Sequence, residues 1–140
     1  MKLEHQVTNL EMSRKLKELG VKQESYFVWV DRFPVFNDQP HIASRIEFQQ
    51  RLTTSILSVE AQALVGWYSA FTAAELGEML PKTIRKGDTA KARKVWFGEQ
   101  TTYIQYTDNE KEMIPMTAIA GSEADARAKM LIYLIEQNLM

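Results

Sequence analysis

Helix-capping sequences near both ends of the chain enclose segments with the composition of strands, and this order restricts the fold more than any other feature. Thr8 and Glu11 form a capping box, in which each side chain bonds to the other residue's amide. Apolar residues then recur every three or four positions up to Leu19, as on one helix face. Gly20 suits the left-handed residue after a helix. The pattern predicts a helix over residues 9–19.

A second strong helix is predicted at the other end of the sequence. Ser122 is its expected cap, and acidic residues in the first turn suit the positive end of the helix dipole. We therefore expect a helix over residues 123–138, packed on a sheet through one broad apolar stripe. That stripe consists of Ala124, Ala128, Leu131, Ile132, Ile135 and Leu139.

The middle of the chain carries weaker helix signals. Thr72 and Glu75 form another capping box, and Pro81 ends the short helix that follows. Gly77 lies inside that helix, where it costs about 1 kcal/mol relative to Ala. A close approach of another backbone segment to this position would explain the glycine. Residues 41–65 favour one or two helices with an interruption at residues 53–55.

Strand signals lie between the helices. Residues 26–30 are apolar on both faces, as in a central or doubly covered strand. Residues 94–98 and 101–106 predict a hairpin that turns at residues 98–100, and residues 113–117 predict an edge strand that contains Pro115. The chain of 140 residues is thus expected to be a single α+β domain over residues 1–140. In it, a small antiparallel β-meander packs against N- and C-terminal helices.

Three stretches, residues 10–30, 69–81 and 123–136, resemble a group of small uncharacterised proteins encoded in bacteriophage and prophage genomes. The resemblance implies a phage-derived origin and a bacterial cytoplasm. It implies no activity and no site residues. From the residues alone, the same stretches are helix caps, core stripes and one aromatic strand, which specify a fold rather than a function.

The charge balance opposes a general attraction to polyanions. The chain has 17 basic and 18 acidic residues, a formal net charge of −1, so no overall field draws it to nucleic acid or to an anionic membrane. Cysteine is absent, which excludes disulfides and thiolate chemistry. No apolar run approaches the roughly 20 residues of a membrane span. We expect a cytoplasmic protein.

One charge asymmetry stands out. Residues 82–94, expected to be a loop, hold six basic residues and only one acidic residue. Basic residues next to an aromatic ring can hold phosphates and stack bases, or contact an acidic protein. The favoured alternative is a solvated loop with Trp96 in the core. The candidate contact residues are Lys82, Arg85, Lys86, Lys91, Arg93, Lys94 and Trp96.

Catalytic patterns are scarce. His5 and His41 lie in separate segments and do not form a metal-binding motif, so we expect no metal and no other cofactor. No nucleophile motif or phosphate loop occurs. The carboxylates of Glu75 and Glu78, three residues apart on one predicted helix, fit a capping box and a solvated face better than carboxylate chemistry. We therefore do not expect an enzyme.

The sequence favours a non-catalytic, phage-derived accessory or protein-interaction protein. Its partner is not identified, and a homodimer through an exposed strand edge is expected. The alternative is a weak nucleic-acid-binding module that uses residues 82–97.

Overall fold

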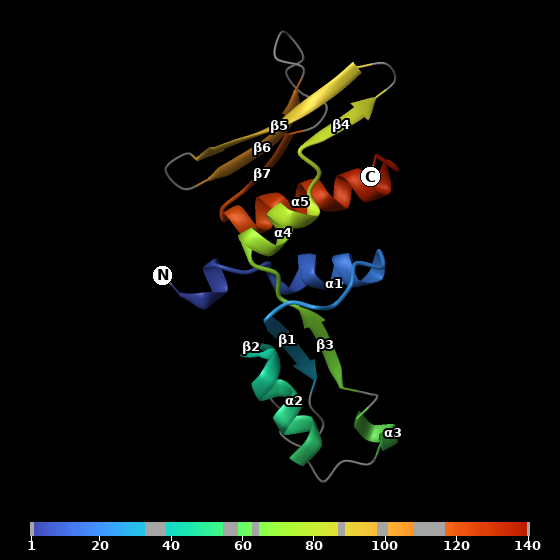
Figure 1. Cartoon of the computed structure of the whole chain (residues 1–140). Coiled ribbons are helices and arrows are strands. Elements are labelled where there is room, and N and C mark those ends of the chain that lie inside the picture. The colour runs from blue at the N-terminus through green and yellow to red at the C-terminus, as the bar shows by residue number, and fades with distance from the viewer. Residues whose placement is uncertain are drawn as a thin grey trace. The chain divides into compact units, whose positions relative to one another are not determined.

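The computed structural model describes residues 2–32, 39–54, 59–62, 65–86, 89–97, 101–107 and 117–139. These residues form two compact units: unit 1 comprises residues 1–8 and 72–140, and unit 2 comprises residues 9–71. Helices and antiparallel sheets both occur, which confirms the predicted α+β fold (Figure 1). Whether the chain is one domain stays a prediction.

Unit 2 contains a three-stranded antiparallel sheet in the order β2-β1-β3. The prediction that the aromatic strand is central is confirmed, since β1 pairs with a strand on each side. The strand β2 was not predicted, because the sequence of residues 41–65 favours helices, and no element was predicted for the residues of β3. The elements of unit 2 are α1 (Leu10–Glu18), β1 (Phe27–Arg32), β2 (His41–Ser44), α2 (Arg45–Thr54), α3 (Val59–Gln62) and β3 (Gly66–Ser69).

The core of unit 2 lies between its sheet and α2. Val28 and Val30 of β1 are buried together with Phe48 of α2. The helix α1 contacts β3 and is capped by Asn9, whose Oδ1 accepts a hydrogen bond from Met12 N at 2.8 Å. The predicted cap at Thr8 is therefore wrong by one residue.

Unit 1 contains a meander of four strands in the order β4-β5-β6-β7, each antiparallel to the next, where the sequence predicts three strands. The predicted turn at residues 98–100, and residues 113–116 of the third predicted strand, lie outside the described residues. The elements of unit 1 are η1 (Leu3–His5), α4 (Ala73–Met79), β4 (Thr83–Lys86), β5 (Thr89–Phe97), β6 (Thr102–Thr107), β7 (Thr117–Ala120) and α5 (Glu123–Glu136).

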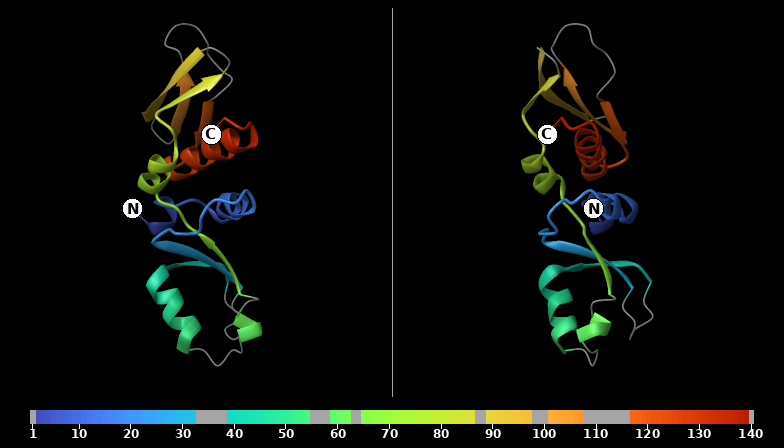
Figure 2. Two further views of the ribbon diagram at one scale, coloured as in Figure 1. Left: turned by 45° about the vertical axis from the view of Figure 1, so that its right-hand side comes forward. Right: turned by 90° about the vertical axis from the view of Figure 1, so that its right-hand side faces the viewer.

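The helix α5 lies along one face of this meander and also contacts α4 (Figure 2). Ser122 caps it as predicted, since its Oγ accepts a hydrogen bond from Asp125 N at 3.1 Å. The buried face is rotated from the predicted stripe, because α5 is covered on two sides: Ile132 and Ile135 are only half-buried. The buried residues are Ala124, Ala126, Ala128, Met130, Leu131 and Leu134.

Candidate binding surfaces

The basic segment is a β-hairpin and not the loop that the sequence predicts. Only Lys82 precedes the hairpin, and its side chain is exposed. The strands β4 and β5 pair from Thr83 opposite Ala92 to Lys86 opposite Thr89. The β5 strand starts five residues earlier than predicted, because the alternation of basic with small or apolar residues suits a strand with two different faces.

Strand register separates the basic residues onto two faces of the sheet. Ile84 and Tyr106 are buried on the α5 side, so Lys91, opposite Ile84, and Arg93, opposite Tyr106, hold positions on that face. Lys86 follows Ile84 by two residues and shares its face. Arg85 and Lys94 hold positions on the other face. The strand register therefore does not assign the basic positions of β4 and β5 to a single face.

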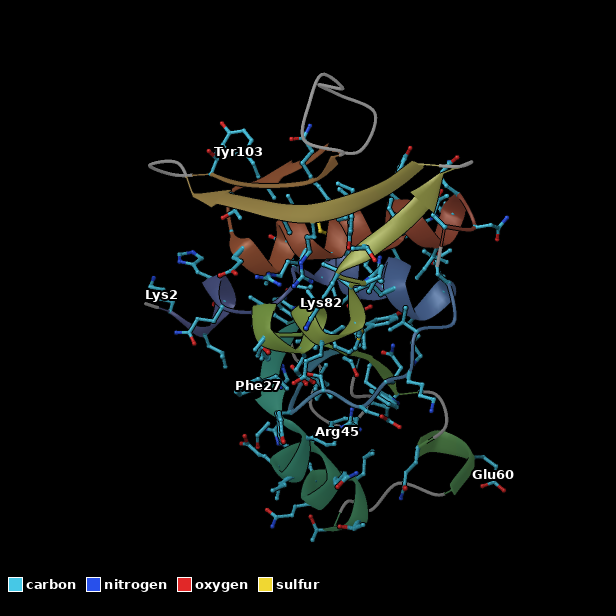
Figure 3. All side chains as sticks on the ribbon, turned by 45° about the horizontal axis from the view of Figure 1, so that its top comes forward. Lys2, Phe27, Arg45, Glu60, Lys82 and Tyr103 are labelled. Carbon is cyan, nitrogen blue, oxygen red and sulfur yellow. The ribbon has the colours of Figure 1, made fainter. Side chains whose placement is uncertain are left out.

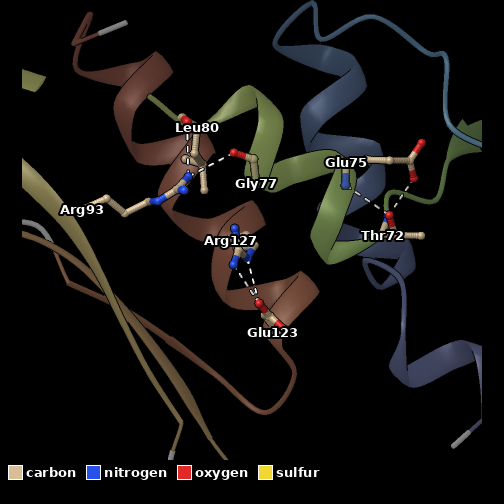
Figure 4. Close-up of polar contacts among 7 residues, drawn as sticks. All are labelled: Thr72, Glu75, Gly77, Leu80, Arg93, Glu123 and Arg127. Carbon is tan, nitrogen blue, oxygen red and sulfur yellow. Dashed lines mark hydrogen bonds and ion pairs between the residues drawn. The ribbon is translucent and has the colours of Figure 1, made fainter. Parts of the chain in front are cut away.

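Arg93 is engaged inside unit 1. Its Nη1 donates to the carbonyl oxygens of Gly77 at 3.0 Å and of Leu80 at 3.3 Å (Figure 4). These carbonyls end α4, where a cation is favoured by the helix dipole and by unsatisfied C=O groups. Arg93 therefore lies in a strand and not in the predicted loop, and its guanidinium caps a helix, while its predicted contact with a ligand stays a prediction.

Tyr106 fixes the same junction between α4 and β4. Its hydroxyl donates to Pro81 O. Burial raises the pKa of Tyr106 to about 12, against a smaller opposing effect of the Arg93 and Arg127 charges. The phenol is therefore neutral at physiological pH. Together, Arg93 and Tyr106 hold the three carbonyls at residues 77, 80 and 81.

The face of the meander away from α5 combines aromatic and basic positions. Trp96 lies opposite Tyr103, and Lys94 lies opposite Gln105. Figure 3 shows the half-buried Tyr103 side chain on this side of the sheet. Aromatic and basic positions on one sheet face suit stacking against bases beside a phosphate backbone.

A second candidate surface, in unit 2, was missed by sequence reasoning. Tyr26 is 77% exposed and Ile46 is 70% exposed, and these are the large hydrophobic residues found exposed among the described residues. Arg45 N donates to Tyr26 O at 2.8 Å, so the two exposed side chains come from hydrogen-bonded backbone segments. We call Tyr26 and Ile46 the apolar pair. Their strand-like and helix-like contexts both predicted burial, and nothing in the local sequence signals their exposure.

Arg45 holds the backbone beneath the apolar pair. Its Nε donates to Ser25 O at 2.7 Å, and its Nη2 donates to Gln23 O at 2.5 Å. The guanidinium also lies 5.6 Å from the centroid of the Trp67 ring. Because these bonds organise the start of α2, the apolar pair is presented by an ordered frame.

Cations also cover the aromatic residues of β3. Lys17 Nζ lies 4.4 Å from the Trp67 ring centroid and donates to Trp67 O at 2.7 Å. Arg14 lies 5.4 Å from the Tyr68 ring centroid and pairs with Asp31 at 3.0 Å. Desolvation lowers the pKa of Lys17. Such contacts stabilise the packing of α1 on β3.

The histidine in unit 2 has partners for both ring nitrogens. His41 Nε2 lies 3.2 Å from Arg51 Nη1, which can only donate, so Nδ1 carries the proton and donates to Gln39 O at 3.0 Å. Within the described ranges, no group of three His, Cys, Asp or Glu side chains could hold a metal ion.

Comparison of the chain with protein-family models, with curated proteins and with solved structures gives no match. In the part of the chain that the structure describes, no helix is both long and apolar enough to span a bilayer.

Proposed function

We propose that this chain is a non-catalytic accessory protein of phage origin that acts by binding a protein partner in the bacterial cytoplasm. The apolar pair is the observation that carries the proposal. Tyrosine is among the residues enriched in protein interfaces, and rigid aromatic side chains dominate binding energy there. The phage origin rests on the resemblance of residues 10–30, 69–81 and 123–136.

The polar residues around the apolar pair support binding rather than chemistry. Arg45 has hydrogen-bond acceptors within the fold, and so has Ser25, whose Oγ donates to Ala70 O at 2.8 Å. The arrangement offers an ordered apolar contact with a polar rim, as in the anatomy of protein interfaces.

Site-specific photocrosslinking in bacterial cells tests this proposal. A photoreactive phenylalanine analogue at position 26 should give one defined adduct, whereas the same analogue at the exposed position Glu18 should give none. The adduct partner is then identified by mass spectrometry and purified. Tyr26→Ser should weaken its binding at least about tenfold, equal to about 1.4 kcal/mol, and Glu18→Ser should not. Equal adducts at both positions, or equal affinities of the two variants, would reject the proposal.

A second candidate function is the binding of single-stranded nucleic acid, which the placement of Trp96 opposite Tyr103 favours. The net charge of −1 and the separation of the basic residues oppose it. We therefore expect no appreciable binding of a labelled single-stranded 30-mer at physiological salt, measured by fluorescence anisotropy. Micromolar or tighter binding that is lost in Arg85→Ala/Lys94→Ala, but kept in the exposed control Lys129→Ala, would establish this function instead.

A further inference from the structure

The three-stranded sheet of unit 2 has one outer edge that is closed by side chains. Ala70 N donates to Phe27 O at 2.9 Å, so these two residues form a hydrogen-bonded pair of the antiparallel ladder. Because hydrogen-bonded and non-hydrogen-bonded pairs alternate along such a ladder, the backbone N–H and C=O groups of Trp67 and Ser69 point away from β1. Trp67 O accepts a hydrogen bond from Lys17 Nζ, and Ser69 N donates to Gln23 Oε1, both at 2.7 Å. Side chains therefore occupy two of the polar backbone groups on the outer edge of β3.

The opposite edge, along β2, is open. Arg45 N donates to Tyr26 O, so the same alternation points the backbone groups of Ile42 and the N–H of Ser44 away from β1. Among the described residues, no strand pairs with this edge. Nor does β2 contain a Lys, Arg, Asp or Glu, the residues that commonly protect edge strands.

We propose that the outer edge of β2 pairs with the same edge of a second copy of this chain. The two three-stranded sheets would then form one antiparallel six-stranded sheet. The inference rests on the proposed function, because it treats the apolar pair as part of an interface. It deepens that function by naming a second copy of the chain as the partner at that surface.

Two features of β2 favour a second copy. A two-fold axis at Ile42 places this residue opposite Ile42 of the second copy. The N–H group of each Ile42 then donates a hydrogen bond to the C=O group of the other. Because β2 lacks charged side chains, its self-pairing brings no like charges together. The axis also keeps α2 on the same face in both copies, and Ile46 lies in the first turn of α2, which directly follows β2.

The absence of cysteine allows a direct test on the full chain. Directly opposed, hydrogen-bonded residues of an antiparallel pair have Cα atoms about 5.5 Å apart, within the range that a disulfide bridges. Under mild oxidation at tens of micromolar, Ile42→Cys should give a disulfide-linked dimer. The matched control Glu60→Cys, at an exposed position of α3, should stay mainly monomeric (Figure 3).

Analytical ultracentrifugation of the unmodified chain should give twice the mass of one copy, and Ile42→Lys should restore the monomer with an unchanged circular dichroism spectrum. A monomeric unmodified chain, or equal crosslinking at positions 42 and 60, would overturn the inference. If the chain is a monomer but position 26 still gives the adduct with another protein, the pairing of two copies is contradicted and the proposed function is kept. If the chain is a dimer and position 26 gives no adduct with another protein, the pairing of two copies is kept and the proposed binding of another protein is contradicted.

Discussion

At the scale of single residues, two arginines that the sequence suggests are surface charges form hydrogen bonds and an ion pair within unit 1. Arg93 donates to the carbonyls at the end of α4, and Arg127 pairs with Glu123 through Nε at 3.1 Å and Nη2 at 2.8 Å. Long cationic side chains can cover backbone and apolar surface while they keep polar partners. A run of basic residues is therefore not by itself a binding surface.

Arg93→Ala should destabilise the protein by about 2 kcal/mol, because hydrogen bonds from a charged donor contribute about 1.5–3 kcal/mol and the α4 carbonyls lose their partner. Arg93→Lys should lose less, since a cation stays near the end of the helix. Urea denaturation measures both variants. Lys82→Ala, at an exposed position of the same basic segment, is the control and should change stability by less than about 0.5 kcal/mol. Equal effects of Arg93→Ala and Lys82→Ala would contradict the capping role.

Gly77 owes its place to a side chain rather than to the close approach of backbone that the sequence predicts. A Cβ at this position would overlap Arg127 Nη1 (Figure 4). Because this atom is the far end of a flexible side chain, Arg127 can move aside at a small cost, and Gly77→Ala should raise stability in the native chain by less than the propensity difference of about 1 kcal/mol. In an Arg127→Ala background, where nothing has to move, the same change should give the full gain. Thermal unfolding of the native chain, the two single variants and the double variant gives the comparison, and equal gains in both backgrounds would contradict an effect of Arg127 on this position.

At the scale of elements, local capping signals predicted helix ends well. Thr72 and Glu75 form their reciprocal bonds at 3.2 and 2.9 Å, and Ser122 caps α5. The cap of α1 was missed by one residue because Thr8 and Asn9 are both good caps. The choice depends on the distant pairing of Val7 with Thr72, which holds the chain extended before Asn9.

Elements that depend on distant partners could not be predicted. Each of β2 and β3 has only four residues, and both exist because they pair with β1. For the candidate surfaces, the face that Arg93 occupies follows from its register with Tyr106. The exposure of Tyr26 and Ile46 likewise follows from how β1 and α2 meet. Such facts come from non-local pairing, which composition and spacing do not encode.

The helix α5 is covered by the meander and by α4, and this burial predicts the effect of substitutions on its buried face. Leu134→Ala should cost about 2–5 kcal/mol, because Leu134 is fully buried and the deletion leaves a cavity. Ile135→Ala should cost clearly less, since Ile135 is half-buried and its neighbours can relax. Chemical denaturation of the two variants gives the comparison. A larger loss for Ile135→Ala would restore the stripe that the sequence predicts and reject the rotated face.

At the scale of the whole molecule, unit 2 is one continuous segment and unit 1 is not. The chain leaves unit 1 after Thr8 and returns to it at Thr72, and a β-bridge joins Val7 to Thr72 at this point. A segment whose two ends are joined by such a bridge resembles an insertion into a loop, and such insertions are tolerated where the two ends lie close together. The predicted single domain over residues 1–140 can be tested at this junction.

We expect a shortened chain, in which a short glycine linker replaces residues 9–71, to keep the helices and sheet of unit 1. Its core should survive, because Leu76, Ile104, Leu131 and Leu134 are buried within elements of unit 1 that contact one another. Circular dichroism and a cooperative thermal transition measure the outcome, and Leu134→Ala in the shortened chain should lower the midpoint. Cooperative unfolding that responds to this substitution would show that unit 1 folds independently of unit 2. A shortened chain without a cooperative transition would support one domain, in which the two units fold only together.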